Sequence, residues 1–295
     1  MTPTFTTGAD LLGSWFADVE RGEPPVRFKL PDPFTALDVR PGRMILFGGA
    51  PGGGKTAALM QVGIDLLRMN GSARLMIANV EMSPALLVER VASRLSAVPL
   101  TAIMDRTLTA DEMGRVRAAV AALEPVAGRL AFLNPPYSLE HVAAAGTAFG
   151  ANVLVLDYIQ RFSVGDSGQD KREQLEAGIT VLRRFCDTGA AVLVAAAVAR
   201  QKSNSGSTYA GLNLASFRGS SELEFGCDAA YMLVPDEGGG ITLQCEKNRY
   251  GAVADLQTSF DPTRQTFGPF VEVSGLDRFE NAKPARTRGK QAKGG

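Results

Sequence analysis

A glycine-rich run that ends in Lys-Thr constrains this chain more than any other feature. It reads Gly49-Ala50-Pro51-Gly52-Gly53-Gly54-Lys55-Thr56 and fits G-x-x-x-x-G-K-[ST] at every fixed position. The glycines let the backbone curl so that its N–H groups point inward at phosphate oxygens. Lys55 adds a positive charge toward the β- and γ-phosphates, and the Thr56 hydroxyl can bind Mg²⁺. The run therefore predicts a site for a nucleoside triphosphate with Mg²⁺.

The residues around this P-loop support that interpretation over a glycine-rich turn that happens to contain Lys-Thr. A predicted strand over residues 44–47 precedes the loop, and an apolar helical run over 57–67 follows it. The N-terminus of such a helix favours an anion. We therefore expect the nucleotide to contact the loop and the start of the helix, at Gly49, Ala50, Pro51, Gly52, Gly53, Gly54, Lys55, Thr56 and Ala57.

The rest of the pattern predicts an α/β fold built on a mainly parallel sheet. Short apolar runs at residues 44–47, 75–80, 130–133, 153–156 and 191–196 alternate with helical patterns. Near-continuous apolar strands between helices are typical of a parallel sheet covered by helices on both faces. After about Ala229, turns separate the runs at 230–234, 241–245, 256–260 and near Phe270, which predicts a C-terminal antiparallel extension.

Both ends of the chain differ from this central domain, to which we assign residues 34–275. Residues 1–33 predict one helix over 9–19 and then a proline-rich linker, with Leu11, Leu12, Trp15 and Phe16 on one face of the helix. Because so short a helix cannot bury that face alone, it either folds back on its own domain or docks on a neighbouring subunit. Residues 276–295 are polar and basic, and we expect them to form a disordered tail.

Composition excludes several classes of site and of protein. A single histidine and three widely spaced cysteines argue against His-based triads, metal clusters and a disulfide scaffold, and indicate a reduced, cytoplasmic protein. No run of about 18 apolar residues occurs, so we expect no membrane contact. Basic and acidic residues balance at 31 each, but five basic residues and no acidic one lie between Asn281 and Gly295. A local groove or this tail would have to hold any nucleic acid.

Two carboxylates follow predicted strands, in positions where nucleotide hydrolysis needs acids. Asp157 ends the apolar run 153–156 and could hold the Mg²⁺ shell. Glu81 directly follows the run 75–80, where a parallel sheet would present it beside the P-loop as a group that orients water. The alternatives are a simple strand-end cap for Asp157 and a carboxylate near the N-cap of the next helix for Glu81.

The order of several short segments resembles that of the bacterial replicative helicase, the DnaB family. The match extends over roughly residues 30–272, and the ordered set is more specific than any one motif. It rests on Phe34-Thr35-Ala36-Leu37-Asp38, Asn79-Val80-Glu81-Met82-Ser83 with Arg90, Arg106-Thr107-Leu108-Thr109, Leu156-Asp157-Tyr158-Ile159-Gln160, Phe217-Arg218-Gly219-Ser220-Ser221 and Glu246-Lys247-Asn248-Arg249-Tyr250-Gly251. The resemblance implies a RecA-like ATPase core.

The resemblance also implies roles for individual residues. Glu81 would orient the attacking water, Asp157 would associate with Mg²⁺, and Arg90 would lie near the ATP. Lys247 and Arg249 would reach the nucleotide of the next subunit, as an arginine finger with a basic companion. Alternation along a strand puts both side chains on one face, and a guanidinium can stabilise charge that develops on the γ-phosphate. An ordinary solvated strand face is the alternative for this pair.

Contact with single-stranded DNA is a further implication of the resemblance. Arg218, Gly219 and Ser221 follow a polar stretch at residues 201–207, as in a loop that enters a central channel, and Lys202 lies in that stretch. Such contacts with the phosphate backbone are independent of sequence and sensitive to salt. A surface loop that ends in a helix cap is the alternative. The implied partners are single-stranded DNA, further copies of the chain in a hexameric ring, and replication proteins.

The chain departs from the family's pattern in two places. Ala196 and Ala197 occupy the positions of a Ser-Gln pair whose Gln senses the γ-phosphate, so we expect weaker coupling between hydrolysis and loop movement. Residues 1–33 stand where the family carries a separate N-terminal domain, which indicates a stand-alone motor domain.

The sequence as a whole favours an ATP-dependent DNA helicase or translocase that hydrolyses ATP at its subunit interfaces. Two alternatives stay open: a RecA-like ring ATPase that acts on protein partners or in assembly, with weak nucleic-acid binding, and a nucleotide-dependent scaffold with negligible turnover. Retention of Glu81, Lys247 and Arg249 argues against the scaffold. Arg218 and the basic tail favour the DNA motor over the protein-directed ATPase.

Overall fold

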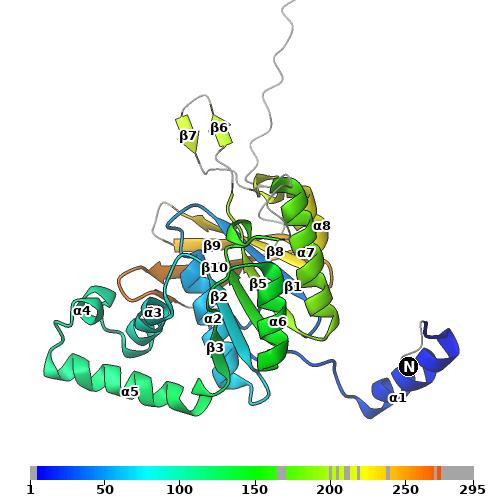
Figure 1. Cartoon of the computed structure of the whole chain (residues 1–295), viewed down its shortest axis with the longest axis horizontal. Coiled ribbons are helices and arrows are strands. Elements are labelled where there is room, and N and C mark those ends of the chain that lie inside the picture. Colours follow the sequence, from blue (N-terminus) through cyan, green and yellow to red (C-terminus); the bar gives the residue numbers. More distant parts are fainter. Residues whose placement is uncertain are drawn as a thin grey trace, which may run out of the picture.

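One large sheet runs through the body of the protein in the computed structural model (Figure 1). The structure describes residues 5–164, 171–198, 201–203, 206–208, 213–217, 220–236, 240–268 and 271–273. Within these residues ten strands form the sheet in the order β11-β10-β9-β8-β1-β5-β4-β2-β3, and β12 pairs with β10.

The central part of the sheet is parallel, as predicted. It consists of β1 (Met44–Gly49), β2 (Leu75–Asn79), β3 (Leu130–Phe132), β4 (Val153–Asp157), β5 (Ala191–Ala195) and β8 (Ala229–Pro235). Every residue of β1, β2, β4 and β5 is buried, which explains why these strands are continuous apolar runs in the sequence. The expectation that the run 230–234 belongs to the antiparallel extension was incomplete, because β8 pairs in parallel with β1 on its other side.

The antiparallel extension begins at the pairing of β8 with β9 (Gly240–Asn248) and continues through β10 (Asp255–Asp261), β11 (Thr266–Phe267) and β12 (Val271–Val273). Strand β9 runs beyond the predicted end at residue 245. The apolar alternation ends at Cys245, but after a register shift the ladder continues until Asn248 lies opposite Ala229.

Helices cover both faces of the sheet, and the sheet separates the hydrophobic core into two clusters. On one face lie α2 (Lys55–Met69), α3 (Pro84–Ser96) and α5 (Ala110–Ala127), and α4 (Leu100–Met104) packs against α3. On the other face lie α6 (Leu139–Phe149), α7 (Lys171–Asp187) and α8 (Ser220–Gly226). Alternate strand residues serve the two faces: Ile77 packs with the α2 side, and Met76 with the α6 and α7 side. Short helical turns η1 (Ile159–Arg161) and η2 (Leu214–Ser216) and a hairpin of β6 (Gln201–Ser203) and β7 (Gly206–Thr208) complete the described elements.

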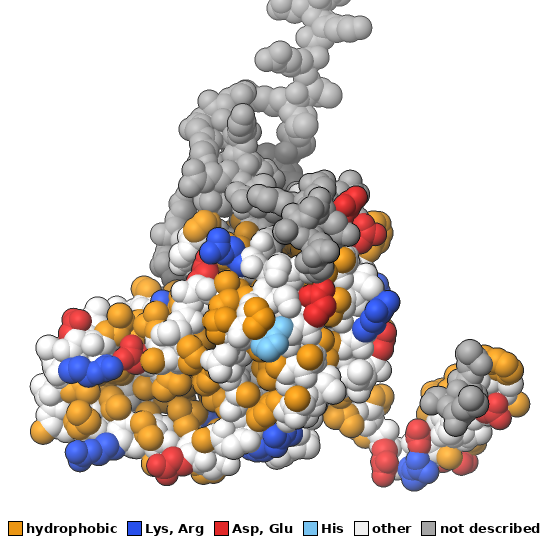
Figure 2. All heavy atoms as spheres, in the orientation of Figure 1, with side chains coloured by type: hydrophobic (Ala, Val, Ile, Leu, Met, Phe, Trp, Pro, Cys, Tyr) orange, Lys and Arg blue, Asp and Glu red, His pale blue; other side chains and the backbone are white. Residues whose placement is uncertain are grey.

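The N-terminal helix α1 (Gly8–Arg21) stands apart from this body (Figure 2). Thr7 and Asp10 form a capping box at its start, and Gly22 ends it in the left-handed conformation. None of its residues is buried, so it does not fold back on its own domain. The linker that follows joins the core earlier than expected, since Phe28 and Leu30 are buried. Among the described residues, no helix has the length and apolar character needed to cross a bilayer.

Candidate nucleotide-binding site

The P-loop connects the end of β1 to the start of α2, as the sequence predicts. Gly54 caps α2 with a positive φ of 85° and offers no side chain to the first turn of the helix. A Cβ at Gly54 would lie 3.0 Å from the Phe267 ring and 3.3 Å from the Phe260 ring, so the loop needs glycine there for space as well as for conformation. The helix therefore leaves its first N–H groups for an anion.

Lys55 forms no ion pair with an acidic side chain in the described part of the chain. Its Nζ donates to the carbonyl oxygens of Gly49 at 2.8 Å and Ala50 at 2.9 Å, both in its own loop. Burial lowers the pKa of Lys55, against the opposing effect of the charges on Asp157 and Glu81. A bound phosphate would supply a direct anionic partner for this ammonium group.

Asp157 is the last residue of β4, and it is buried beside Thr56 of the P-loop. Its Oδ2 accepts hydrogen bonds from the Thr56 hydroxyl at 2.5 Å and from the Asn79 side-chain amide at 3.0 Å. Burial raises the pKa of Asp157, and the charge of Glu81 adds to that effect, although the Thr56 hydrogen bond and the charges of Lys55 and Arg90 oppose it.

The oxygens of Thr56 and Asp157 fit Mg²⁺. They lie in contact, and Mg²⁺ binds through one or two protein oxygens together with waters and substrate phosphates. Among the described residues, no group of three or more His, Cys, Asp or Glu side chains could hold a metal ion.

One cavity of about 420 Å³ brings together the predicted P-loop, Glu81, Arg90 and Asp157. Glu81 is exposed and follows β2 by two residues. Its N–H and that of Met82 donate to Asn79 Oδ1 at 2.9 and 2.8 Å. The contribution of Asn79 was missed in the sequence, where an asparagine at a strand end carries no distinguishing signal.

Arg90, a residue of α3, lines another side of this cavity. Its Nη1 donates to Gln265 Oε1 at 2.5 Å, and its Nε is buried without a hydrogen-bond partner among the described residues. Gln265, Pro262 and Phe260 also line the cavity, from β10 and the turn before β11. The sequence did not predict this turn beside the P-loop, because about 200 residues separate it from Lys55 in the chain.

Ala197 also lines the cavity, in the position where the resemblance expects a sensor glutamine. Its N–H donates to Gln160 Oε1 at 2.9 Å, and its carbonyl accepts from Gln160 Nε2 at 3.3 Å. The amide of Gln160 therefore binds the backbone at this position, and the methyl group of Ala197 cannot form a hydrogen bond with a phosphate.

Lys247 and Arg249 lie at the other end of the sheet and do not line this cavity. Because β9 is antiparallel to β8, Asn248 lies opposite Ala229, which in turn pairs with Ile45 near the start of β1. Lys247 Nζ donates to the carbonyl oxygens of Glu224 at 2.5 Å and Cys227 at 2.8 Å. Within one chain the structure therefore does not bring this pair to the P-loop.

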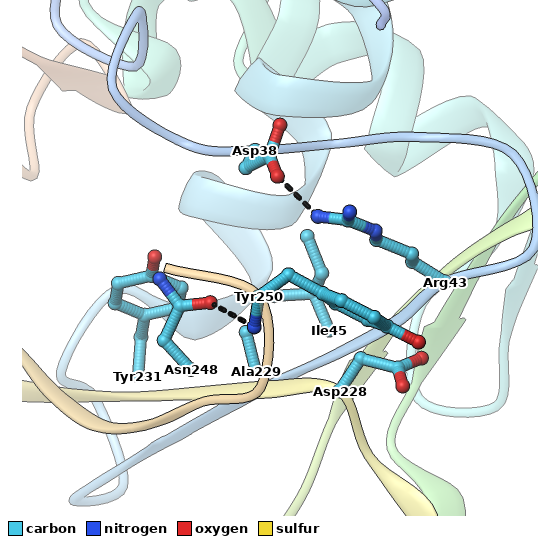
Figure 3. A pocket seen from close by; sticks show the side chains of 8 residues that line it. All are labelled: Asp38, Arg43, Ile45, Asp228, Ala229, Tyr231, Asn248 and Tyr250. Carbon is cyan, nitrogen blue, oxygen red and sulfur yellow. Dashed lines mark hydrogen bonds and ion pairs between the residues drawn. The ribbon is translucent and has the colours of Figure 1, made fainter. Parts of the chain in front are cut away.

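Asp228 holds Arg249 at that end. The carboxylate is only 1% exposed, and it accepts from Arg249 at 2.9 Å, from Arg183 at 2.6 Å and from the Met44 N–H at 2.9 Å. Figure 3 shows the adjoining cluster, in which the Arg43 guanidinium lies over the Tyr250 ring, 4.0 Å from its centroid. No sequence motif marked Asp228.

One predicted DNA-binding residue, Lys202, lies within a segment that starts and ends beside the P-loop, and the others follow that segment in the sequence. Val198 and Phe217 form an isolated antiparallel bridge, and a Cβ on Gly48 would lie 2.5 Å from the Phe217 ring. Between them the hairpin β6–β7, which contains Lys202, stands away from the sheet (Figure 1). Ser221 lies in α8, whereas Arg218 and Gly219 lie outside the described residues.

Comparison with known proteins agrees with this architecture. The family model for the DnaB-like helicase C-terminal domain matches residues 33–269. A solved structure described as an ATPase domain has a TM-score of 0.78 and 15% identity, with 90% of this chain and 99% of that chain covered. A DnaB-like replicative helicase, described with its interactions with primase, has a TM-score of 0.75 and 15% identity over 90% of this chain and 67% of that one. No curated protein sequence matched.

Proposed function

The chain belongs to the family of DnaB-like helicase C-terminal domains, an ATP-hydrolysing helicase family, and on that premise we propose that it works as a ring. In this proposal each subunit binds ATP with Mg²⁺, hydrolyses it at an interface with the next subunit, and the ring moves along single-stranded DNA. The replication proteins of such a system are further partners.

The position of Arg249 carries the proposal. It lies at the opposite end of the sheet from the P-loop of its own chain, beside the start of β1. A guanidinium that stabilises charge on the γ-phosphate must contact that phosphate. Arg249 can do this only for the nucleotide of another subunit, with Lys247 beside it.

At the nucleotide, the residues of the chain that contains the P-loop have separate roles. Lys55 and the loop N–H groups bind the phosphates, Thr56 and Asp157 hold Mg²⁺, and Arg90 contacts the nucleotide on the side of Gln265. Bound Mg²⁺ neutralises phosphate charge. Glu81 orients the attacking water from the exposed edge of the cavity.

Helix α1 supports assembly into a ring. Its exposed side chains Leu11, Leu12, Trp15, Phe16 and Val19 are each more than half accessible to solvent. A contiguous apolar face of this kind marks an interaction site. We propose that α1 docks on the neighbouring subunit, and that six subunits close the ring.

The segment between Val198 and Phe217 supports contact with DNA. The hairpin β6–β7, which contains Lys202, stands away from the sheet, and Ser221 lies in α8. Lys202 and Ser221 would contact the phosphate backbone, together with Arg218 and Gly219, which lie outside the described residues. Because such contacts release counterions, binding should weaken as salt rises.

Steady-state ATP hydrolysis with and without single-stranded DNA tests the motor. We expect stimulation of several-fold that declines with salt, and less stimulation for Arg218→Ala. Arg117→Ala, which removes an exposed arginine from α5, is the matched control and should behave as the unchanged protein. Hydrolysis that is indifferent to DNA would contradict the DNA motor and favour a ring ATPase that acts on protein partners.

A mixing experiment tests the shared site. Lys55→Ala lacks the phosphate-binding lysine and Arg249→Ala lacks the finger, so each variant alone should hydrolyse ATP very slowly. In mixed rings, Arg249 of a Lys55→Ala subunit can face an intact P-loop, and activity should rise above that of either variant. Because Arg183 still pairs with Asp228, loss of Arg249 does not leave that buried carboxylate unpaired. Activity that never rises on mixing would contradict a site between subunits.

A further inference from the structure

Asn79 ends strand β2 directly beside Asp157. It is 5% exposed, and the two residues are register partners at the ends of neighbouring parallel strands. Ile77 and Val155, two positions earlier in each strand, pack on the face of the sheet that α2 covers. Because side chains alternate along a strand, Asn79 and Asp157 point to that same face, toward the start of α2.

Three hydrogen bonds connect the Asn79 amide to the Asp157 carboxylate and to the backbone of the turn that carries Glu81. Nδ2 donates to Asp157 Oδ2 at 3.0 Å, while Oδ1 accepts from the N–H groups of Glu81 at 2.9 Å and Met82 at 2.8 Å. The same Asp157 oxygen accepts from Thr56. One side chain therefore joins the acid at the P-loop to the turn that carries Glu81.

An amide has the chemistry that this position needs. It donates through nitrogen and accepts through oxygen, whereas a carboxylate only accepts and a leucine of similar size does neither. An aspartate would keep the bonds to the turn but would lose the bond to Asp157 and put a second carboxylate beside it. Leucine therefore removes all three bonds, whereas aspartate removes only the bond to Asp157.

We propose that Asn79 is a positioning residue that holds the Glu81 turn in register with Asp157, so that hydrolysis depends on a side chain that does not line the cavity. The inference rests on the proposed role of Glu81 in orienting water. Asn79 acts on the reaction only through these two neighbours.

Asn79→Leu tests the proposal through kcat for basal ATP hydrolysis and through the affinity for a fluorescent ADP analogue. Small displacements of a catalytic group lower rates strongly, so we expect kcat to fall roughly 10- to 100-fold. The Lys55 contacts are untouched, so ADP affinity should stay within about threefold, which separates positioning from loss of binding. A kcat near that of the unchanged protein, or a parallel loss of ADP affinity, would overturn the proposal.

Asn79→Asp removes the bond to Asp157 and places a second carboxylate beside it, but keeps the bonds to the turn, because its carboxylate still accepts from the two N–H groups. We expect a fall in kcat of the same order as for Asn79→Leu. Full activity in this variant would show that the turn alone matters and would overturn the proposed connection between the two acids.

Asn152→Asp is the matched control. Asn152 precedes β4 at the opposite end of the sheet, where its Oδ1 accepts from the Arg74 N–H at 2.8 Å and its Nδ2 donates to the Ser72 carbonyl at 2.9 Å. The substitution therefore removes the same donor and should leave kcat unchanged. An equal loss in both variants would contradict a positioning role. Absence of hydrolysis in the unchanged protein would instead count against the proposed function.

Discussion

Charged side chains gather at both ends of the central strands, but the two ends pair them differently. At the P-loop end, the Lys55 ammonium donates to carbonyl oxygens of its own loop, and Asp157 accepts from a hydroxyl and an amide. At the opposite end, Asp228 pairs with Arg183 and Arg249. Within the described part of the chain, neutral donors hold the buried carboxylate at the first end, whereas two arginines pair with the buried carboxylate at the second end.

The pKa shifts express the same difference. Burial lowers the pKa of Lys55 and raises that of Asp157, so both groups move toward their neutral forms. At the other end burial acts to raise the pKa of Asp38, yet the hydrogen bond from Arg40 and the charges of Arg43, Arg40 and Arg27 outweigh it and lower that pKa. Among the described residues, the P-loop end thus leaves Lys55 and Asp157 without a hydrogen-bond partner of opposite charge, whereas the opposite end pairs its carboxylates, Asp38 and Asp228, with arginines.

The largest expected effect is that of Asp228→Ala on stability. Removal of this buried carboxylate leaves two arginines and the Met44 N–H without their partner, which should cost about 3–5 kcal/mol of unfolding free energy. Urea denaturation measures the loss. Asp228→Asn retains an acceptor and should lose less. A loss below about 1 kcal/mol would mean that the ion pairs of Asp228 contribute little to the stability of the fold.

Lys55→Ala should show the reverse pattern. Loss of a phosphate-binding charge should slow ATP hydrolysis by about 10²–10³-fold, equivalent to roughly 2.7–4 kcal/mol of transition-state stabilisation. The melting temperature without nucleotide should hold, because only two hydrogen bonds to loop carbonyls disappear. As a control from the opposite end, Arg40→Ala should leave hydrolysis unchanged. A large fall in the melting temperature of Lys55→Ala would mean that Lys55 also stabilises the fold, which would contradict this comparison of the two ends.

Asp157→Asn should stabilise the protein without nucleotide while it abolishes rapid hydrolysis. Because the folded state raises the pKa of Asp157, its ionised form at neutral pH opposes folding, and this group favours the folded state more as pH falls through that pKa. We expect a gain on the order of 1 kcal/mol, or about 2–4 °C in melting temperature for a domain of this size. Differential scanning calorimetry at pH 7 measures it, and a lower melting temperature would contradict the prediction.

Asp38→Asn should have the smallest effect and the opposite dependence on pH. The lowered pKa of Asp38 means that its stabilisation is present above the unfolded-state pKa and is lost as pH falls through the folded-state value. Its arginine partners are partly exposed, so the effect at pH 7 should be below about 1 kcal/mol. Melting temperatures of both proteins should converge in acid. A difference that persists there would exclude a charge effect.

The sequence predicted the buried strands well because burial on both faces makes each a continuous apolar run, as in β4 and β5. Prediction from the sequence failed where tertiary contacts determine which residues are buried. Phe28 and Leu30 lie near prolines that suggested a linker, yet both reach the core. The periodicity of α1 showed an apolar face but could not show whether its own domain covers that face.

The same distinction separates the site residues. Lys55 and Thr56 belong to a contiguous motif whose geometry the backbone determines, so local spacing identifies them. Asn79 bonds a partner 78 residues away, and Asp228 bonds the Met44 N–H across 184 residues. No local spacing connects these pairs, and only the fold brings them together.

The bridge between Val198 and Phe217 has a consequence for evolution. Both ends of the intervening segment are tied to the sheet beside Gly48, so an insertion or deletion between Ser203 and Gly206 would change the reach of the hairpin and leave the nucleotide cavity in place. Doubling a flexible loop's length costs only about 0.6 kcal/mol of closure free energy. Selection can therefore alter the hairpin's length and chemistry independently of the ATP site. Related proteins could then differ in what the hairpin contacts while they keep the same nucleotide cavity.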